Sequence, residues 1–91
     1  MQIIWSKTAI ANLIEIRAYI GMDNPHAASR MAQNLLQAGN TLKTLPNRGR
    51  PTGLADVREL VVPGTPYLLV YRVTAEAVQI LRVWHGAQER S

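Results

Sequence analysis

The sequence lacks cysteine and phenylalanine, and its only aromatic residues are two tryptophans and three tyrosines. Without cysteine, the chain can form no disulfide and no thiolate metal site, and it has no cysteine nucleophile. With so few aromatic rings, a surface that stacks nucleic-acid bases is poorly supported. No apolar run approaches the ~18 residues of a membrane span, and the first residues do not resemble a secretion signal. We therefore expect a cytoplasmic protein without a cofactor, a bound metal or a membrane-spanning segment.

The length and the charge of the chain limit what it can be. With 91 residues and 47% hydrophobic content it can form one modest core, so we predict a single domain over residues 1–91. Ten lysines and arginines against six acidic residues give a net charge of +4. This excess suits an acidic partner, either nucleic acid or an acidic protein surface. It equally suits a small domain that only needs charge to stay soluble.

A short strand and a helix are predicted at the start of the chain. Residues 2–5 have a β-type composition, and Ser6 follows them as an N-cap, because its hydroxyl can accept a hydrogen bond from a free amide of the first turn. Apolar residues then recur with helical spacing at Ala9, Leu13, Ile16 and Ile20. Gly21 predicts the end of this helix.

A second, longer helix is predicted from Asn24 and Pro25. Asn24 suits the cap, and Pro25 suits the first helical position, where its missing amide costs nothing. The apolar stripe of this helix has alternating spacings of three and four residues: Ala28, Met31, Leu35, Ala38, Leu42 and Leu45. Pro46 ends the helix before a basic loop at residues 47–51.

The second half of the chain has a β pattern. Residues 57–62, 67–73 and 77–84 are rich in β-branched, aromatic and leucine residues and predict three strands. The connections at 63–66 and 74–76 are short enough to permit only antiparallel hairpins. We predict an α+β fold: an N-terminal strand, a helical hairpin and an antiparallel three-stranded meander, forming a twisted sheet with two helices on one face.

The predicted strands are apolar on both faces, although two helices can cover only one. In the middle strand, Leu69 and Val73 alternate with Leu68 and Val70, which leaves few polar residues for a face in water. One explanation is an exposed apolar groove that receives a helix or an added strand from another chain. The expected edge of this groove consists of Arg58, Tyr71, Arg72, Arg82 and Trp84. The alternative is a sheet that twists enough to bury this surface within the chain.

Several short motifs follow one another along nearly the whole chain: Asn24-Pro25, Gly49-Arg50, Arg58-Glu59-Leu60, Val70-Tyr71-Arg72-Val73, and Val78-Gln79-Ile80-Leu81 followed by His85. In this order and spacing they resemble the RelE/ParE family of toxins from type II toxin-antitoxin systems. The resemblance implies a toxin that a cognate antitoxin holds inactive, with a disordered antitoxin segment wrapping the sheet and helices. Such a segment would also cover the second apolar face.

The family contains ribosome-dependent mRNA endonucleases and ParE-like poisons of DNA gyrase. RNA cleavage requires a base, an acid and cations for the developing phosphorane charge. The RelE-type nucleases resemble one another in carrying bases on two adjacent strands, at places where this chain has Leu60, Val61, Val62 and Leu68. The resemblance therefore favours a ParE-like toxin that inhibits gyrase. A RelE-like mRNA interferase acting on the ribosome is the alternative, and a non-toxic nucleic-acid-binding or scaffold domain is a third.

A nuclease site in this chain would have to use Arg82 as its cation and His85 as its acid, helped by Tyr71 or Arg72. We expect Arg82 on the same side of its strand as Ile80 and Trp84, where an antitoxin carboxylate is the simpler contact. For His85, a structural hydrogen bond is the simpler role. The ending Gln88-Glu89-Arg90 also replaces the basic and aromatic ending of the nucleases.

Contacts to the antitoxin or the target are predicted in four segments. The basic loop presents two guanidinium groups between two prolines, which reduces the entropy lost on binding. Arg58, beside Glu59, is most simply part of a cross-strand salt bridge, with a partner contact as the other interpretation. The predicted contact residues are Arg48, Arg50, Arg58, Leu68, Val70, Tyr71, Arg72, Arg82, Trp84 and His85.

Overall fold

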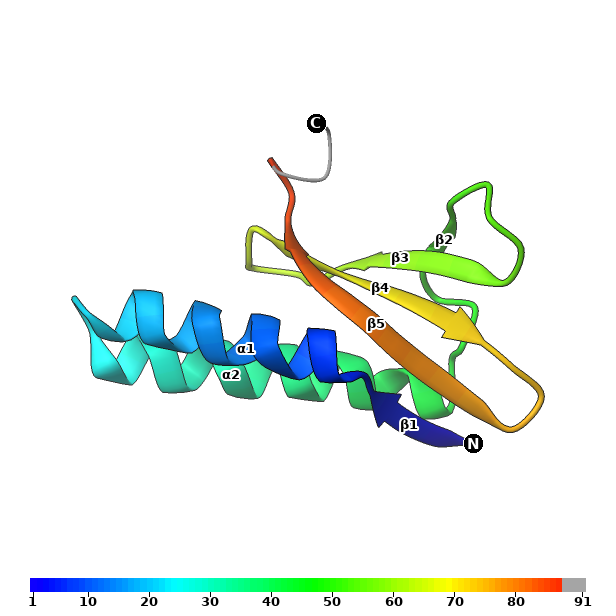
Figure 1. Cartoon of the computed structure of the whole chain (residues 1–91), viewed down its shortest axis with the longest axis horizontal. Coiled ribbons are helices and arrows are strands. Elements are labelled where there is room, and N and C mark those ends of the chain that lie inside the picture. Colours follow the sequence, from blue (N-terminus) through cyan, green and yellow to red (C-terminus); the bar gives the residue numbers. More distant parts are fainter. Residues whose placement is uncertain (88–91) are drawn as a thin grey trace.

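The computed structural model describes residues 1–87 and contains a helical hairpin and a five-stranded sheet (Figure 1). In chain order the elements are β1 (Gln2–Trp5), α1 (Lys7–Gly21), α2 (Pro25–Asn40), the 3-10 helix η1 (Thr41–Lys43), β2 (Arg50–Pro51), β3 (Val57–Val61), β4 (Tyr67–Val73) and β5 (Ala77–His85). The predicted α+β class, its two helices and its four strands are confirmed. The segment Gln88-Glu89-Arg90 lies outside the described residues. Within residues 1–87, neither helix combines the length and apolar character needed to cross a membrane.

Both helices start at the capping residues that the sequence predicts. Ser6 Oγ accepts a hydrogen bond from the backbone N–H of Ala9, at 3.0 Å. Asn24 Oδ1 accepts one from the backbone N–H of Ala27, also at 3.0 Å. The end of the second helix differs from the prediction. Regular α-helix stops at Asn40, because the Thr41 hydroxyl donates to the Ala38 carbonyl at 2.6 Å and the chain tightens into η1. The last residue of the predicted stripe, Leu45, is consequently 58% exposed.

The strand order in the sheet is β1-β5-β4-β3-β2. β3, β4 and β5 form the predicted antiparallel meander, while β1 pairs in parallel with β5. The short edge strand β2 pairs with β3 and was not predicted, because two residues are too few to show a periodic pattern.

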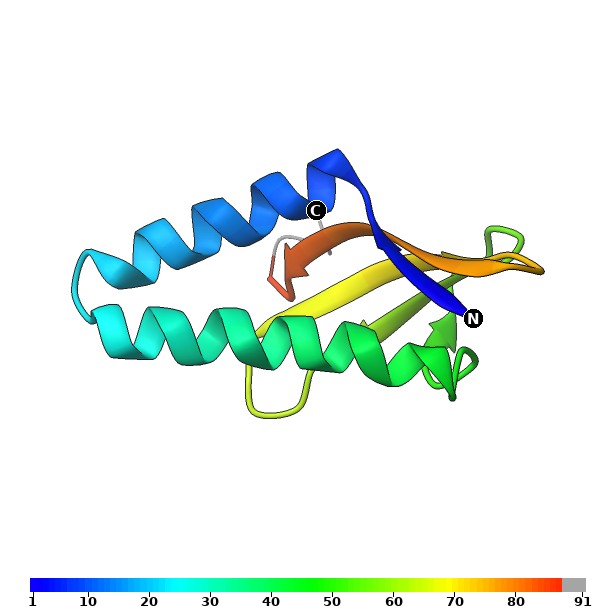
Figure 2. The ribbon, with the colours of Figure 1, turned by 90° about the horizontal axis from the view of Figure 1, so that it is seen from below.

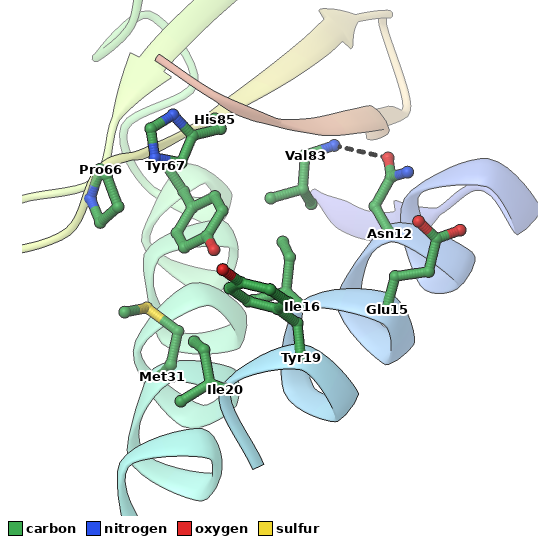
Figure 3. Close-up of a pocket in the computed structure, with 10 residues that line it drawn as sticks. All are labelled: Asn12, Glu15, Ile16, Tyr19, Ile20, Met31, Pro66, Tyr67, Val83 and His85. Atoms are coloured by element: carbon green, nitrogen blue, oxygen red, sulfur yellow. Dashed lines mark hydrogen bonds between the residues drawn. The ribbon is translucent and has the colours of Figure 1, made fainter. Parts of the chain in front are cut away.

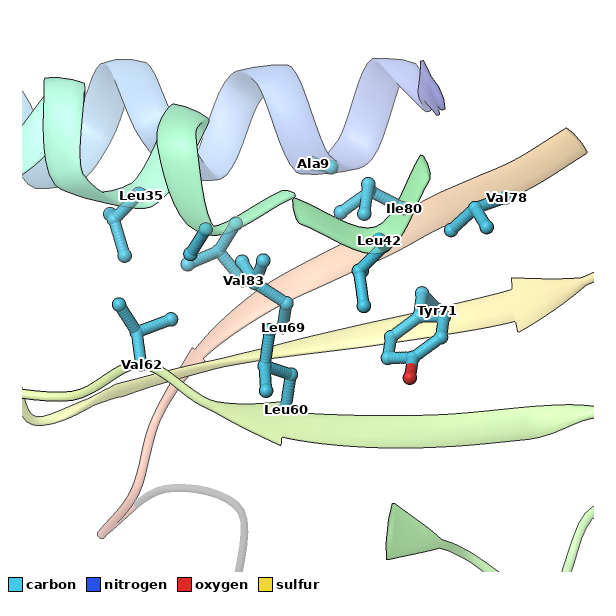
Figure 4. Packing of buried hydrophobic residues seen from close by; sticks show 11 residues of the cluster. Ala9, Leu35, Leu42, Leu60, Val62, Leu69, Tyr71, Val78, Ile80 and Val83 are labelled. Carbon is cyan, nitrogen blue, oxygen red and sulfur yellow. The ribbon is translucent and has the colours of Figure 1, made fainter. Parts of the chain in front are cut away.

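The core lies between the sheet and the helical hairpin, which covers one face of the sheet (Figure 2). Its members come from every layer (Figure 4): Ala9, Leu35, Ala38, Leu42, Leu60, Val62, Leu69, Tyr71, Val78, Ile80 and Val83. Trp5 of β1 packs against this cluster, so the start of the chain is tied to both β5 and the hairpin.

A β-bulge in β5 changes which residues share a face. Val70 is paired with Arg82, whereas the next residue, Tyr71, is paired with Ile80, so Leu81 is the extra residue. Ile80 therefore faces the helices and is fully buried, and Arg82 points to the opposite face. The prediction that Arg82 shares a side with Ile80 is wrong for this reason: strict alternation fails across a bulge.

Candidate binding surfaces

The sheet face turned away from the helices, here called the outer sheet face, is built from alternate residues of three neighbouring strands. They are Val57, Glu59 and Val61 of β3, Leu68, Val70 and Arg72 of β4, and Gln79, Arg82 and Trp84 of β5. Val61 is 58% exposed, while Leu68 is only 4% exposed because Val61 and Trp84 flank it on the adjacent strands. The second apolar face of the prediction thus exists, and part of it is buried by its own neighbours.

Arg82 and Trp84 form a cation–π pair on this face. The Arg82 Cζ atom lies 5.6 Å from the centroid of the Trp84 ring. Arg72 adds a second exposed guanidinium on the adjacent strand. The face therefore combines aliphatic side chains, one aromatic ring and positive charge, which fits an acidic amphipathic segment better than a neutral one.

Arg58 and Tyr71 are absent from this face, contrary to the prediction that they edge it. They lie opposite each other on the helix-facing side of β3 and β4, where Tyr71 is fully buried. The Arg58 guanidinium donates to the carbonyl of Gly49 at 2.7 Å and to that of Asn47 at 3.4 Å. Tyr71 Oη accepts from the Gly49 N–H and donates to the Pro46 carbonyl, each at 2.8 Å. Both residues therefore hold the basic loop in place.

The two arginines of the basic loop also have partners within the chain. Arg48 Nη1 donates to Thr41 Oγ1 at 3.0 Å. Arg50 forms an ion pair with Glu59 at 3.1 Å, across the β2–β3 ladder. The prediction that Arg58 takes part in a cross-strand salt bridge is wrong: Arg50 is the cation that pairs with Glu59, while Arg58 donates to backbone carbonyls. Because the Arg50 side chain remains 63% exposed, it is still accessible to another chain.

A pocket of about 720 Å³ opens between α1, the first half of α2, the start of β4 and the end of β5 (Figure 3). Its polar members are Asn12, Glu15, Tyr19, Tyr67 and His85, and its apolar members are Ile16, Ile20, Met31, Pro66 and Val83. Asn12 fixes α1 to the sheet, because its Oδ1 accepts from the Val83 N–H at 3.0 Å. The rings of Tyr67 and His85 meet edge to face, with centroids 5.5 Å apart. Burial raises the pKa of Tyr67, and the neighbouring Tyr19 phenol raises it further.

No sequence pattern indicates this pocket as a site, and only one of its members, His85, is among the predicted site residues. Asn12 and Tyr19 are seven residues apart in α1, but Tyr67 comes from β4, far along the chain, so no local spacing connects the helix residues with the strand residues. The one available signal was Asn12, a polar residue directly before Leu13 of the apolar stripe of α1.

The two residues predicted as a nuclease pair do not come together. His85 lines the pocket on the helix side of the sheet, whereas Arg82 stacks on Trp84 on the outer sheet face. His85 Nδ1 accepts from the Ala87 N–H at 3.1 Å, which is the structural hydrogen bond that we considered the simpler role. Residues 1–87 also contain no cluster of three potential metal ligands from His, Asp and Glu.

Residues 3–90 match the family model of the ParE toxin of the type II toxin-antitoxin system parDE. The chain belongs to this family. The toxin is 44% identical to Toxin RelE2 of Caulobacter vibrioides over 96% of its own length and 97% of that protein. It is 39% identical to Putative toxin Y4kP of Sinorhizobium fredii, over 93% and 88% of the two chains. Its structure resembles a chain of the chromosomal ParDE system of P. aeruginosa with a TM-score of 0.86, 27% identity and coverage of 93% and 95%.

These matches confirm the RelE/ParE resemblance and the fold that it implied. A toxin of a type II system has a cognate antitoxin as its partner, so the toxin must carry a surface that another chain covers. The relatives bear both RelE and ParE names, so they do not distinguish gyrase from the ribosome as the target.

Proposed function

We propose that this toxin acts as a ParE-like inhibitor of DNA gyrase, that it catalyses no reaction itself, and that its cognate antitoxin neutralises it by covering the outer sheet face. The observation that carries the proposal is the composition of this face. Its centre is apolar, with Val61, Leu68 and Val70 on adjacent positions of β3 and β4. A nuclease needs cations and a proton donor there, and a leucine or valine can neutralise no phosphate.

The ionisable groups near this face support the same proposal. Glu59 is paired with Arg50, and its side chain is only 12% exposed, so it is poorly placed to act as a base on RNA. His85 lies on the opposite side of the sheet from Arg82, which separates the candidate acid from the candidate cation. A surface of this kind is suited to binding rather than to proton transfer.

The alternative is a ribosome-dependent mRNA interferase. It is favoured by the name RelE2 of a relative that is 44% identical, and by two exposed guanidinium groups, Arg72 and Arg82, on the outer sheet face. In this alternative, Arg82 would stabilise the phosphorane and removing it would cost about 100-fold or more in cleavage rate.

Antitoxin binding to the outer sheet face follows from the same composition. A helix that presents apolar residues at positions i, i+4 and i+7 could place them over Val61 and Val70. Acidic residues at its edges would then meet Arg72 and Arg82, which lie on the same face. Residual contacts could extend into the pocket beside α1, whose Tyr19 side chain is 74% exposed.

Two parallel assays test the target. Purified toxin is added to gyrase with relaxed plasmid, and to ribosomes programmed with mRNA, and both are repeated with Arg82→Ala and His85→Ala. We expect inhibited supercoiling, accumulated cleaved plasmid and intact mRNA, with His85→Ala behaving like the wild type. Growth after expression without the antitoxin serves as the control for toxicity.

Codon-specific mRNA cuts that disappear in Arg82→Ala, with gyrase unaffected, would replace the proposal by the interferase. Normal growth together with no effect in either assay would leave a non-toxic binding domain, the third interpretation.

A further inference from the structure

α1 has a second apolar face that neither the core nor the outer sheet face uses. Ala9 and Ile16 point into the core, but Ile10 and Ile14 are 45% and 64% exposed on the other side of the helix. A helix that is apolar on two sides normally has a neighbour on each of them. Within residues 1–87, only the inner side of α1 packs against a neighbouring element.

The exposed face borders a groove between α1 and α2. Two adjacent hollows of about 380 and 570 Å³ share Ile14 and Arg17, and so run together along the hairpin. Leu36 of α2 borders one hollow and Met22 the other; they are 43% and 82% exposed. At ~1.5 Å per residue, the 15 residues of α1 give this face a length of about 22 Å, enough for three to four turns of a second helix.

The exposed side of α1 forms a ridge along the helix, and the ridges of two copies can pack against each other when the two helices run antiparallel. Lys7, Ile14 and Gly21 are seven residues apart and lie along one line of the helix. If two copies pack antiparallel with Ile14 against Ile14, then Ile10 of one copy meets Ala18 of the other, a large side chain against a small one. The same register brings Lys7 beside Gly21 of the other copy, two residues from Asp23.

We propose that the outer side of the α1–α2 hairpin binds a second copy of this chain, through an antiparallel α1–α1 contact centred on Ile14. Lys7, at one end of this ridge, and Asp23, in the turn just beyond its other end, carry opposite charges and so favour a second copy over an unrelated helix. The outer sheet face remains accessible in such a dimer, because it lies on the other side of the molecule (Figure 1). The proposal does not depend on whether gyrase or the ribosome is the target.

A single helix pair buries less than the roughly 800 Å² per partner of a standard stable interface. We therefore expect a weak dimer that dissociates on dilution. Sedimentation equilibrium of the purified toxin measures its dissociation constant. Ile14→Glu is expected to raise that constant at least about tenfold, because each copy would bury a charge against the other. Val61→Glu, at a position of similar exposure on the outer sheet face, is the matched control and should leave the constant unchanged.

The register is tested by charge reversal. Lys7→Glu and Asp23→Lys should each weaken the dimer, and the two together should restore it. Because the chain has no cysteine, Ile14→Cys should form a disulfide-linked dimer on oxidation, while Val61→Cys should not. Far-UV circular dichroism confirms that each variant is folded.

A toxin that sediments as a monomer at every concentration, or a dimer that Ile14→Glu does not weaken, would overturn the proposal. Failure of the double charge reversal to restore the dimer would overturn the antiparallel register. Amide-exchange protection of the outer face of α1 only when the antitoxin is bound would assign this face to the antitoxin instead.

Discussion

At the scale of single residues, Tyr71 and Gly49 are in close contact, and packing explains why glycine occupies position 49. A Cβ atom on Gly49 would lie 2.6 Å from the Glu59 carbonyl oxygen and 2.7 Å from Tyr71 Oη. Glycine is therefore needed at this position for space. The Gly49-Arg50 pair, which contributes to the family resemblance, is explained by the close approach of the loop to β3 and β4.

Tyr71→Phe should destabilise the toxin by about 1–3 kcal/mol, because it removes the hydroxyl that satisfies the buried Gly49 N–H and the Pro46 carbonyl. Urea unfolding followed by circular dichroism measures the change. Tyr19→Phe is the matched control: its side chain is 74% exposed, and we expect a change within about 0.5 kcal/mol. Equal losses in the two variants would contradict a structural role for the Tyr71 hydroxyl.

The tyrosines also predict a pH dependence. Burial raises the pKa of Tyr71 and of Tyr67 in the folded chain above their ordinary value. Above a pH of about 10 the unfolded chain loses these protons first, so it binds fewer protons than the folded chain and the free energy of unfolding falls as the pH rises. Urea midpoints between pH 8 and strongly alkaline pH should show this decline. Its slope should be smaller in Tyr71→Phe; an unchanged slope would rule out Tyr71 as a source.

At the scale of elements, the contact between β1 and α2 depends on a glycine inside the helix. A Cβ atom on Gly39 would lie 2.6 Å from Trp5 Cζ2. Gly39→Ala should therefore displace the indole and cost about 1–3 kcal/mol, although alanine is the better helix former. Urea unfolding gives the cost, and Trp5 emission in a Trp84→Phe background reports the displacement.

Gly21→Ala, at the end of α1, is the control for this substitution. There the added Cβ would meet only the Ala28 Cβ, at an ordinary 3.6 Å. We expect no loss of stability, or a gain of up to about 1 kcal/mol. Similar losses at both glycines would mean that helix packing, rather than the Trp5 contact, determines the effect.

At the scale of the whole molecule, adjacent residues of β4 belong to different layers and should respond differently to a charge. Leu69 is fully buried under the helices, and Val70 is partly exposed on the outer sheet face. We expect Leu69→Asp to unfold the toxin, because it buries a carboxylate without a partner. Val70→Asp should stay folded and bind the antitoxin at least about tenfold more weakly in titration calorimetry. Unfolding of both variants would mean that the toxin needs both faces for its own stability.

Much of this architecture was determined by local physical chemistry and could be predicted from the sequence. Ser6 and Asn24 start the helices because a side-chain oxygen three residues before a free amide can cap it in any context. The three strands of the meander follow from their composition and from the short connections between them. The family resemblance was also contained in the order of the motifs, since that order does not depend on coordinates.

Which residues share a site was decided only by the tertiary structure. The bulge at Leu81 puts Arg82 and Ile80 on opposite faces of the sheet. Arg58 and Tyr71 form hydrogen bonds with Gly49 in the loop after α2, and the alternation of residues along a strand does not predict these bonds. The pocket joins Asn12, Tyr67 and other residues that are distant in the sequence. Spacing along a chain predicts neighbours only within one element, while bulges and loop contacts depend on interactions with the rest of the molecule.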